Sequence, residues 1–593
     1  AASDVYKRQF MNMAVVGLFS LGLASCSDEL NISSIDPQSK TTYDDMELLA
    51  KQYATLGLTG QAGPAGKPDI SADEGETGFY RTTFNLQELC SDECIWAWQN
   101  DNDIPALTNI AWTAASDRVN WAYQRLAYDI TLFNQYLSET ETREGDDYKK
   151  YRAEVRFLRA LHYWYFLDLF HKAPFKLVYN PEVLPEEKAG VDLYSWLDQE
   201  LTEIEPELAE VGAFNNKANF GRADRGAAYA LHARLALNSE VYTDGQIKDY
   251  QKAIDYCDKI LVDNAGKYEL CREAKNGHSG YEQLFMGDND YNEQAMKEII
   301  FPIRQDGKKT EAYAGSSYLI NSMRVSGMPY AGTSDMWSCN FARKALATRF
   351  LDIENNNDAK NLAKMLSETK EYKKDYEAYT KGKTFADAGA ASDPTKMTEA
   401  EVIAADEALG GSTKNIIRIA NDDRALLYAG VGGGFRTLTT DQISGFTNGL
   451  SVVKWQNSRS DNSTPSDGKF SDTDIPLFRL AEIYLTRAEA KYRLNGTQDK
   501  EDINELRNRA HAAQVSAVNL DVLLNEWGKE FYMEGRRRSD LVRFEKFAGN
   551  KYIWDFKGGV SKGASVDKHF NVYPIPSKDR SNNPNMHQNP KYE

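Results

Sequence analysis

One repeating pattern constrains this chain most. Apolar side chains recur at helical spacing over residues 476–494 (PLFRLAEIYLTRAEAKYRL). They fall on one face of a helix that begins near Pro476, and they are Leu477, Leu480, Ala481, Tyr484, Leu485 and Ala488. The small Ala481 and Ala488 let a neighbouring helix approach closely. The pattern therefore predicts a helix packed against other helices.

The same spacing recurs along much of the chain. Further helices are predicted at 149–171, 222–241, 249–263, 500–511 and 521–548. Several form consecutive pairs joined by short polar loops, as tetratricopeptide repeats do, although a clean repeat of about 34 residues is lacking. The predicted fold class is mostly α: a tetratricopeptide-like helical repeat scaffold with long loops and a few short strands.

Three loop-rich regions interrupt the predicted helices, at about 70–115, 275–345 and 425–475. They are rich in Gly, Asn, Asp, Ser and aromatic residues. Long ordered loops on a rigid scaffold are where binding sites usually form, so we expect the ligand site there. The polar stretch 354–410 is predicted to be a surface excursion. We treat residues 26–593 as a single domain.

The first residues carry targeting information. The apolar run MAVVGLFSLGLA (13–24) is too short to span a bilayer as a helix but suits a signal peptide. It ends in Leu23-Ala24-Ser25-Cys26, which resembles the lipidation motif of bacterial lipoproteins. The alternative is an ordinary secretory signal with an incidental cysteine. We predict lipidation of Cys26. We exclude residues 1–25 from the fold, because 1–10 resemble a cloning or assembly remnant and the rest belong to the predicted signal peptide.

The charge balance argues against nucleic acid as a partner. The chain carries 70 basic and 88 acidic residues, a net charge of −18, which repels a polyanion. The one dense basic cluster is Arg536-Arg537-Arg538, and Glu530, Glu534 and Asp540 accompany it. We expect these arginines to form ion pairs along a helix rather than bind phosphate.

Sequence patterns of common enzymes are missing from the chain. AGVGGGF (429–435) departs from G-x-G-x-x-G, and neither a P-loop, an H-E-x-x-H motif nor a G-x-S-x-G elbow occurs. His162 and His232 lie in predicted helices and are expected to be packed or surface residues rather than ligands. A glycosidase-type carboxylate pair remains open, although none of the 88 acidic residues stands out.

The stretch DECIWAWQND (92–101) places two tryptophans in a polar region. In an extended segment Trp96 and Trp98 face the same side and form a continuous aromatic surface. Flat rings flanked by polar side chains such as Gln99, Asn100, Asp101 and Asn102 suit a sugar, which has apolar faces and a hydroxyl rim. A buried pair that closes the core is equally consistent with this pattern.

Asp472-Thr473-Asp474 is a candidate site for a hard cation. Alternate residues of an extended segment can turn their carboxylates to a common centre, which suits calcium. On spacing alone, a polar turn that caps the following helix is the favoured interpretation.

Several segments together resemble the SusD/RagB family of Bacteroidetes outer-membrane lipoproteins, and the likeness extends over nearly all of 26–593. They are RAEVRFLRALHYWYFLDLFHKAPF (152–175), PLFRLAEIYLTRAEAKYRLNG (476–496), INELRNRA (503–510), EFYMEGRRRSDLVRF (530–544) and YPIPSKDRSNNPNMHQNPKY (573–592). That family has a helical fold built on tetratricopeptide-like repeats, with loops forming a glycan site.

Loop segments are most similar to the starch-binding member of the family: DEGETGFYRTTFN (73–85), DECIWAWQ (92–99), RVSGMP (324–329), WSCNFAR (337–343) and SGFTNGLSVVKWQN (444–457). The resemblance implies an arc of starch-stacking rings at Trp98, Tyr313 and Trp337, with Trp96 possible. It implies that Arg81 and Asp73 contact the sugar. Asp101 stands where that member has asparagine, and an ionised carboxylate accepts but does not donate hydrogen bonds.

The resemblance also implies a structural calcium ion, held by Asp290, Asp472 and Asp474. The implied function is capture of starch or malto-oligosaccharides without cleavage, on the cell surface, by a lipoprotein anchored in the outer membrane. The implied partner is a SusC-like TonB-dependent outer-membrane transporter that receives the glucan. A family member that binds a different glycan, a glycoside hydrolase and a purely structural lid on the transporter are the alternatives.

Overall fold

A computed structural model of the chain describes residues 44–63, 67–70, 75–326, 328, 331–351, 420–431, 434–436 and 443–592. The described residues from 49 onward form one compact unit, which holds the sites described below. The predicted signal peptide, Cys26, Asp73 and the excursion at 354–410 lie outside the described residues. Within the described ranges, every helix is too short or too polar to cross a membrane.

Most of the regular secondary structure in the described residues is helical. In chain order they are α2 (Asp45–Gly57), α3 (Phe79–Glu88), α4 (Ile104–Thr108), α5 (Asp117–Glu139), α6 (Asp146–Phe170), α7 (Gly190–Ile204), α8 (Arg225–Leu237), α9 (Ser239–Tyr242), α10 (Tyr250–Leu261), α11 (Gly280–Gln283), α12 (Glu293–Glu298), α13 (Ser316–Met323), α14 (Lys344–Phe350), α19 (Leu480–Asn495), α20 (Lys500–Arg509), α21 (Leu520–Phe531), α22 (Arg537–Arg543) and α23 (Ser577–Asn582).

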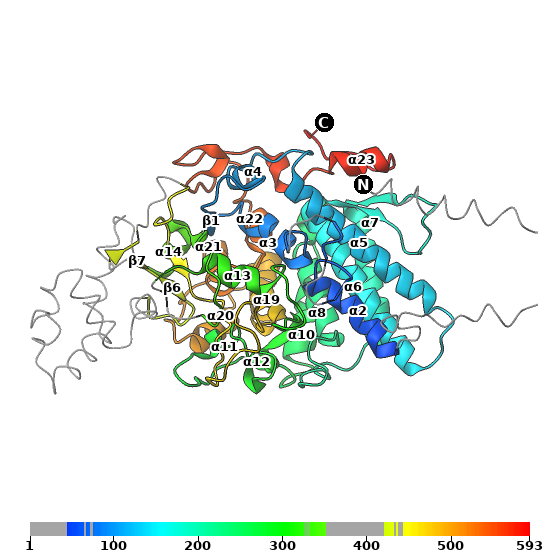
Figure 1. Ribbon diagram of the computed structural model, residues 1–593, viewed down its shortest axis with the longest axis horizontal. Coiled ribbons are helices and arrows are strands. Elements are labelled where there is room, and N and C mark those ends of the chain that lie inside the picture. Colours follow the sequence, from blue (N-terminus) through cyan, green and yellow to red (C-terminus); the bar gives the residue numbers. More distant parts are fainter. Residues whose placement is uncertain are drawn as a thin grey trace, which may run out of the picture. The chain divides into compact units, whose positions relative to one another are not determined.

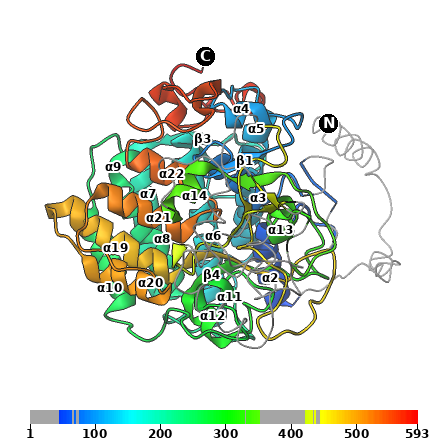
Figure 2. The ribbon, with the colours of Figure 1, turned by 90° about the vertical axis from the view of Figure 1, so that its left-hand side faces the viewer.

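Neighbouring helices pack on one another in succession, as the repeat pattern predicts. α5 contacts α6, α6 contacts α7, and α8 contacts α10. α10 then contacts α19, which in turn contacts α20 and α21. Figure 1 shows α5, α6 and α8 side by side, and Figure 2 shows α10, α19 and α20 together. Every residue from Phe157 to Phe170 of α6 is buried, which explains the nearly unbroken apolar run in that segment.

Two predicted helix boundaries are wrong. The helix predicted from Pro476 begins at Leu480, because Ile475–Arg479 form strand β10, although the predicted apolar face of α19 is largely buried. The single helix predicted at 521–548 is broken into α21 and α22. The chain turns between them through Met533 and Gly535, whose φ values are +57° and +76°, a conformation that a right-handed helix excludes.

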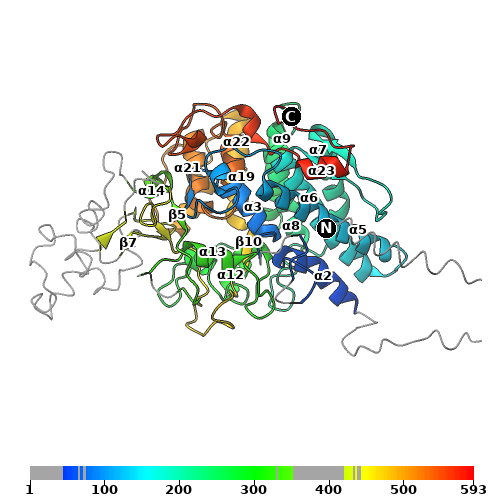
Figure 3. The same cartoon turned by 45° about the horizontal axis from the view of Figure 1, so that its top comes forward.

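The strands are short and all pair antiparallel. They are β1 (Cys94–Trp96), β2 (Lys172–Phe175), β3 (Glu186–Ala189), β4 (Ile299–Ile303), β5 (Asn340–Ala342), β6 (Leu427–Tyr428), β7 (Gly430–Val431), β8 (Gly434–Phe435), β9 (Ser451–Val452) and β10. The pairs are β1 with β5, β2 with β3, β4 with β10, β6 with β9, and β7 with β8. Figure 3 shows β5 close to α13 and α3, where the candidate site lies.

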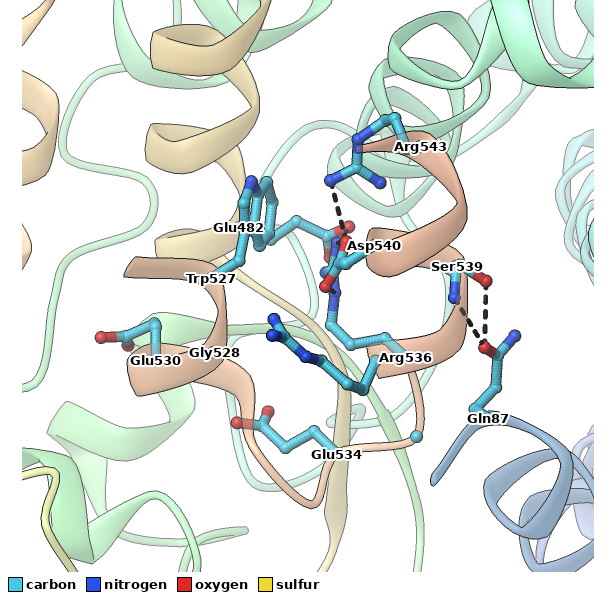
Figure 4. Close-up of polar contacts among 12 residues, drawn as sticks. Gln87, Glu482, Trp527, Gly528, Glu530, Glu534, Arg536, Ser539, Asp540 and Arg543 are labelled. Atoms are coloured by element: carbon cyan, nitrogen blue, oxygen red, sulfur yellow. Dashed lines mark hydrogen bonds and ion pairs between the residues drawn. The ribbon is translucent and has the colours of Figure 1, made fainter. Parts of the chain in front are cut away.

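The arginine cluster forms ion pairs, but only one of them runs along its own helix. Arg536, the residue directly before α22, has its Nε 3.0 Å from Asp540 of that helix. Arg537 Nε instead lies 2.7 Å from Asp92, which comes from the loop after α3. In Figure 4, Arg536 faces Trp527 of α21, and its Cζ lies 4.1 Å from a ring centroid of that indole. The cluster therefore ties α22 to distant segments.

The two helical histidines are buried, as expected of packed residues. His162 Nε2 lies 3.2 Å from Asp129. His232 lies between Asp198, 2.7 Å from its Nε2, and Glu205, 3.0 Å from its Nδ1. Each imidazole therefore joins helices through a carboxylate in the scaffold.

Candidate functional site

The ladder between β1 and β5 brings two tryptophans together. Trp96 pairs with Asn340, and the main chain continues this pairing because Ala97 N donates to Cys339 O over 2.6 Å. Trp98 follows β1 and Trp337 precedes β5. Their indoles therefore meet at the same end of the ladder, although the two residues lie far apart in the sequence.

The segment that carries Trp337 is bound to the end of α13. Trp337 N donates to Asn321 O over 2.7 Å, and Ser338 N donates to Arg324 O over 3.1 Å. Ser338 has a φ of +53°, in the left-handed region that side-chain-bearing residues rarely adopt. This turn carries the chain from Trp337 into β5.

Three rings form a row that we call the aromatic arc: Trp98, Trp337 and Tyr313. Ring centroids of Trp98 and Trp337 lie 6.3 Å apart with planes at 31°, and those of Trp337 and Tyr313 lie 4.9 Å apart with planes at 60°. Trp98 is 36% exposed and the other two are half-buried. Tyr313 donates its hydroxyl hydrogen bond to Asp335 over 2.6 Å. The three ring planes are therefore tilted relative to one another rather than coplanar.

Buried side chains support the arc from below. The Tyr318 ring of α13 lies 6.2 Å from Trp337 and stacks on Trp96 at 5.7 Å. Arg81 of α3 places its Cζ 4.5 Å from the Tyr318 ring centroid, and its Nη1 donates to Tyr313 O over 3.2 Å. Arg81 is only 7% exposed, and the contacts given above let it position the rings. Its hydrogen bond to a sugar stays a prediction.

Of the two interpretations of Trp96 and Trp98, the one in which they share an aromatic surface is wrong. Trp96 is buried and meets Trp98 edge-on, with centroids 6.1 Å apart and planes at 87°. β1 ends at Trp96, and the chain then turns, since Asp101 N donates to Trp98 O over 3.1 Å. The same-side rule of an extended strand therefore stops before Trp98. Trp96 is therefore buried, whereas Trp98 is exposed.

Asp101 has a clear structural partner. Its Oδ2 accepts a hydrogen bond of 2.9 Å from Trp96 Nε1, which fixes the buried indole beneath the arc. The neighbouring Asn102 donates to Asp117 over 2.8 Å. One carboxylate oxygen of Asp101 is thus engaged within the protein, and its predicted contact with a sugar would use the other.

Two glycines of the DEGETG motif allow the chain to pass the arc closely. A Cβ on Gly75 would lie 2.3 Å from the carbonyl carbon of Tyr313, and one on Gly78 would lie 2.3 Å from Ala314 Cβ. Gly75 also has a φ of +98°. The motif is therefore explained by main-chain packing against Tyr313, a role that sequence reasoning missed.

Sequence reasoning also missed Tyr318, Asp335 and Met336. Tyr318 and Asp335 fix the rings by the contacts given above, and Met336 is an exposed apolar side chain next to Trp337. Nothing in the residue types separates Tyr318 from the many other tyrosines. Its role depends on pairing between segments that are distant in sequence.

The three aspartates of the implied calcium site lie in one region, but a guanidinium lies among them. Arg304 Nη2 is 2.9 Å from Asp290 Oδ2, and its Nε is 3.0 Å from Asp474 Oδ2. Burial raises the pKa of Asp474 to about 8; Arg304 opposes this shift, and Asp290 and Asp472 add to it. Asp472 itself accepts from Gly307 N and pairs with Arg459 at 2.7 Å.

As they stand, these side chains fit an ion-paired arginine better than a metal. Across the described ranges, no group of three or more His, Cys, Asp or Glu side chains is close enough to hold a metal ion. The one feature that suits a cation is Asp474 Oδ2, a buried carboxylate oxygen that accepts no hydrogen bond of good geometry from the described residues.

The sequence matches a profile of the SusD family over residues 297–592. Starch-binding protein SusD of Bacteroides thetaiotaomicron is 50% identical over 590 residues, which cover 99% of this chain and 99% of that protein. SusD-like protein P25 of Formosa agariphila is 24% identical over 409 residues, which cover 66% of this chain and 63% of the relative.

Solved structures share the fold. Surface glycan-binding protein A from Bacteroides uniformis superposes with a TM-score of 0.59 at 17% identity, covering 92% of this chain and 99% of its own. Surface glycan-binding protein A from Bacteroides thetaiotaomicron, solved in complex with laminarihexaose, superposes with a TM-score of 0.56 at 16% identity, covering 92% and 98%. The predicted fold class is confirmed.

Proposed function

Because this chain belongs to the SusD family, we propose that it binds starch and malto-oligosaccharides at the aromatic arc and does not cleave them. The relative that is 50% identical over nearly its whole length is named a starch-binding protein. Two of the three arc rings, Trp98 and Trp337, lie in loop segments that resemble the starch-binding member of the family.

The tilt between neighbouring ring planes of the arc is the observation that carries this proposal. Sugars stack their apolar C–H faces on aromatic rings and present hydroxyls at the edge. An α-1,4-glucan curves, so consecutive glucose units turn, as do ring planes at 31° and 60° to one another. A flat glucan would stack well on one ring only. Single contacts are modest, and several in a row select a curved polymer.

Isothermal titration calorimetry on residues 27–593 tests the proposal. We expect maltoheptaose and α-cyclodextrin to bind and cellohexaose, the flat control, to give no heat of binding. Trp98→Ala and Trp337→Ala should each weaken binding of both α-glucans. A wild-type protein that ignores both α-glucans would contradict the starch assignment and leave only the family membership.

Asp101 favours one second candidate, a binder of a different glycan. It replaces a side chain that both donates and accepts hydrogen bonds with one that only accepts when ionised. Laminarihexaose in the same titration separates the two candidates. Tighter binding of laminarihexaose than of maltoheptaose would favour the alternative.

The absence of cleavage is tested separately. We expect no new reducing ends when the purified protein is incubated with amylose. A rise in reducing ends that persists in Trp98→Ala but disappears on mutation of a carboxylate would identify a hydrolase instead.

The proposed location is the outer membrane, with a lipid on Cys26 as the anchor and a SusC-like TonB-dependent transporter as the partner that receives the glucan. The Leu-Ala-Ser-Cys motif supports the anchor. Cys26→Ala should move the protein from the membrane fraction to the soluble fraction. The transporter should co-purify with the lipidated protein from cells grown on starch, and its absence from such preparations would argue against the partnership.

A bound calcium ion would be held by Asp290, Asp472 and Asp474. Arg304, which is 40% exposed, would have to leave these carboxylates. The ion would then offset the burial, and the repulsion by Asp290 and Asp472, that raise the pKa of Asp474. Calcium should raise the thermal unfolding midpoint of the wild type but not of Asp474→Asn. Equal midpoints in calcium and in EDTA would exclude the site.

A further inference from the structure

A cavity of about 470 Å³ lies on the face of α13 opposite the aromatic arc. Tyr318 of this helix contacts the arc, whereas Ile320 and Arg324 line the cavity. At 3.6 residues per turn, Ile320 points about 200° away from Tyr318. Among the described residues that line the cavity, none of the three arc rings is present.

The cavity has one apolar side and one polar side. Ile320, Leu426 and Val453 are buried apolar residues in its lining. On the polar side, the carboxylate of the 5% exposed Glu282 accepts a hydrogen bond of 3.2 Å from Gln456 Nε2. His278 Nδ1 lies 2.9 Å from the same carboxylate oxygen. A buried carboxylate with two neighbouring nitrogen groups thus lies beside an apolar wall.

We propose that this cavity is a second carbohydrate site, which takes a short segment of the same α-glucan; the inference rests on the proposed function. A sugar matches an amphipathic lining because it has apolar faces and a hydroxyl edge. The lining is not set up for a strong anion, since Glu282 lies beside His278 and Arg459 is paired with Asp472 at 2.7 Å. The volume lies within the range of roughly 300–1,000 Å³ that is usual for small-ligand pockets.

Arg324 links the cavity to the arc. Its side chain lines the cavity and donates to Thr333 O. Its main-chain oxygen accepts from Ser338 N and from Ser338 Oγ, each over 3.1 Å, directly after Trp337. The two sites therefore lie on opposite faces of one short helix. Two weak sites on a single chain bind a long polymer more tightly than either site alone.

Two methionines make the two sites separately visible. Met328 lines the cavity, and Met336 is exposed beside Trp337 in the arc. With ¹³C-methyl methionine labelling, each methyl resonance can be assigned by a Met→Leu variant and followed by NMR during titration with maltotriose. We expect both resonances to shift, with different midpoints.

The variants separate a true site from an indirect effect. In Trp98→Ala, the maltotriose midpoint of the Met336 response should rise about tenfold, while the Met328 midpoint stays unchanged. Gln456→Leu should raise the maltotriose midpoint of the Met328 response about tenfold, the equivalent of one hydrogen bond. It should leave the midpoint of the Met336 response unchanged. Should Gln456→Leu fail to fold, Ser463→Trp at the exposed rim of the cavity should block the same response.

The outcomes also distinguish this inference from the proposed function. If Met336 shifts and Met328 does not, or if both midpoints rise together in Trp98→Ala, the second site is overturned and the arc stands. If neither resonance shifts at saturating maltotriose, both the proposed function and the second site fail.

Discussion

Trp96 and Trp98 meet edge to face, with ring centroids 6.1 Å apart and planes at 87°. This geometry is favourable for two aromatic rings, and through it the buried indole fixes the orientation of the exposed indole. Asp101 in turn fixes the buried indole through Nε1. The pair therefore consists of one support and one contact surface.

Trp98→Ala should weaken malto-oligosaccharide binding roughly tenfold, or about 1.4 kcal/mol, because it removes one stacking ring. The free energy of unfolding should change by less than about 1 kcal/mol, since the side chain is partly exposed. Calorimetry and urea unfolding measure the two effects. The matched control is Phe446→Ala, an exposed aromatic outside the arc, which should leave binding unchanged. Equal losses in both variants would contradict an arc-based site.

Asp101→Asn should preserve stability, because an amide oxygen still accepts from Trp96 Nε1. Asp101→Ala leaves this buried donor without its partner and should cost about 1–3 kcal/mol of unfolding free energy. Urea unfolding of both variants checks the difference. If the two variants are equally stable, the hydrogen bond does not hold Trp96 in place.

Gly75→Ala should lower both stability and glucan affinity, because the new Cβ meets the Tyr313 main chain at 2.3 Å and would displace an arc residue. Gly63→Ala is the control: its φ of +75° is also positive, but nothing lies within 4 Å of the added Cβ. It should cost about 1 kcal/mol of stability and leave affinity unchanged. Calorimetry and thermal unfolding distinguish the two, and unchanged affinity in Gly75→Ala would contradict the close packing.

Arg537→Met should destabilise the protein by roughly 3 kcal/mol, because it weakens the pairing of the buried Asp92 charge. Arg349, 2.6 Å from Asp92, limits the loss. Lys551→Met, which removes the exposed pair with Glu545, should cost less than about 0.5 kcal/mol. Chemical unfolding compares them, and similar losses would show that burial of the pair is unimportant.

Stability should fall in acid in a way that depends on Asp198. Burial alone would raise the pKa of Asp198, but hydrogen bonds from His232 and Lys252 lower it to about 2. Because the folded-state pKa is below the unfolded value of about 3.9, the contribution is complete above about pH 5 and is lost progressively as the pH falls through about 2. Urea midpoints from pH 6 to pH 3 should decline less in Asp198→Asn. Parallel declines would contradict the assignment.

Local patterns predicted helix faces well and boundaries poorly. Leu480, Ala481 and Leu485 are buried as their spacing indicates, because helical periodicity depends on neighbours in the sequence. The predicted start of α19 is wrong because Ile475 pairs with Ile303 of β4, a contact that no local pattern reveals.

The arc was predictable only through the family resemblance. Residue types alone left Trp96 and Trp98 undecided, since burial of Trp96 depends on stacking against Tyr318 and on the ladder with β5. For the expected calcium site, by contrast, the sequence did not predict that Arg304 lies among the carboxylates. Partners from distant segments decided the outcome in both cases.

The bonds that hold the arc segments in place are largely main chain to main chain. Trp337 N binds Asn321 O, Ala97 N binds Cys339 O, and Ser338 N binds Arg324 O. Such bonds do not depend on which side chain projects from the frame. Side chains at these positions can therefore be exchanged without breaking the hydrogen bonds that hold the arc segments together.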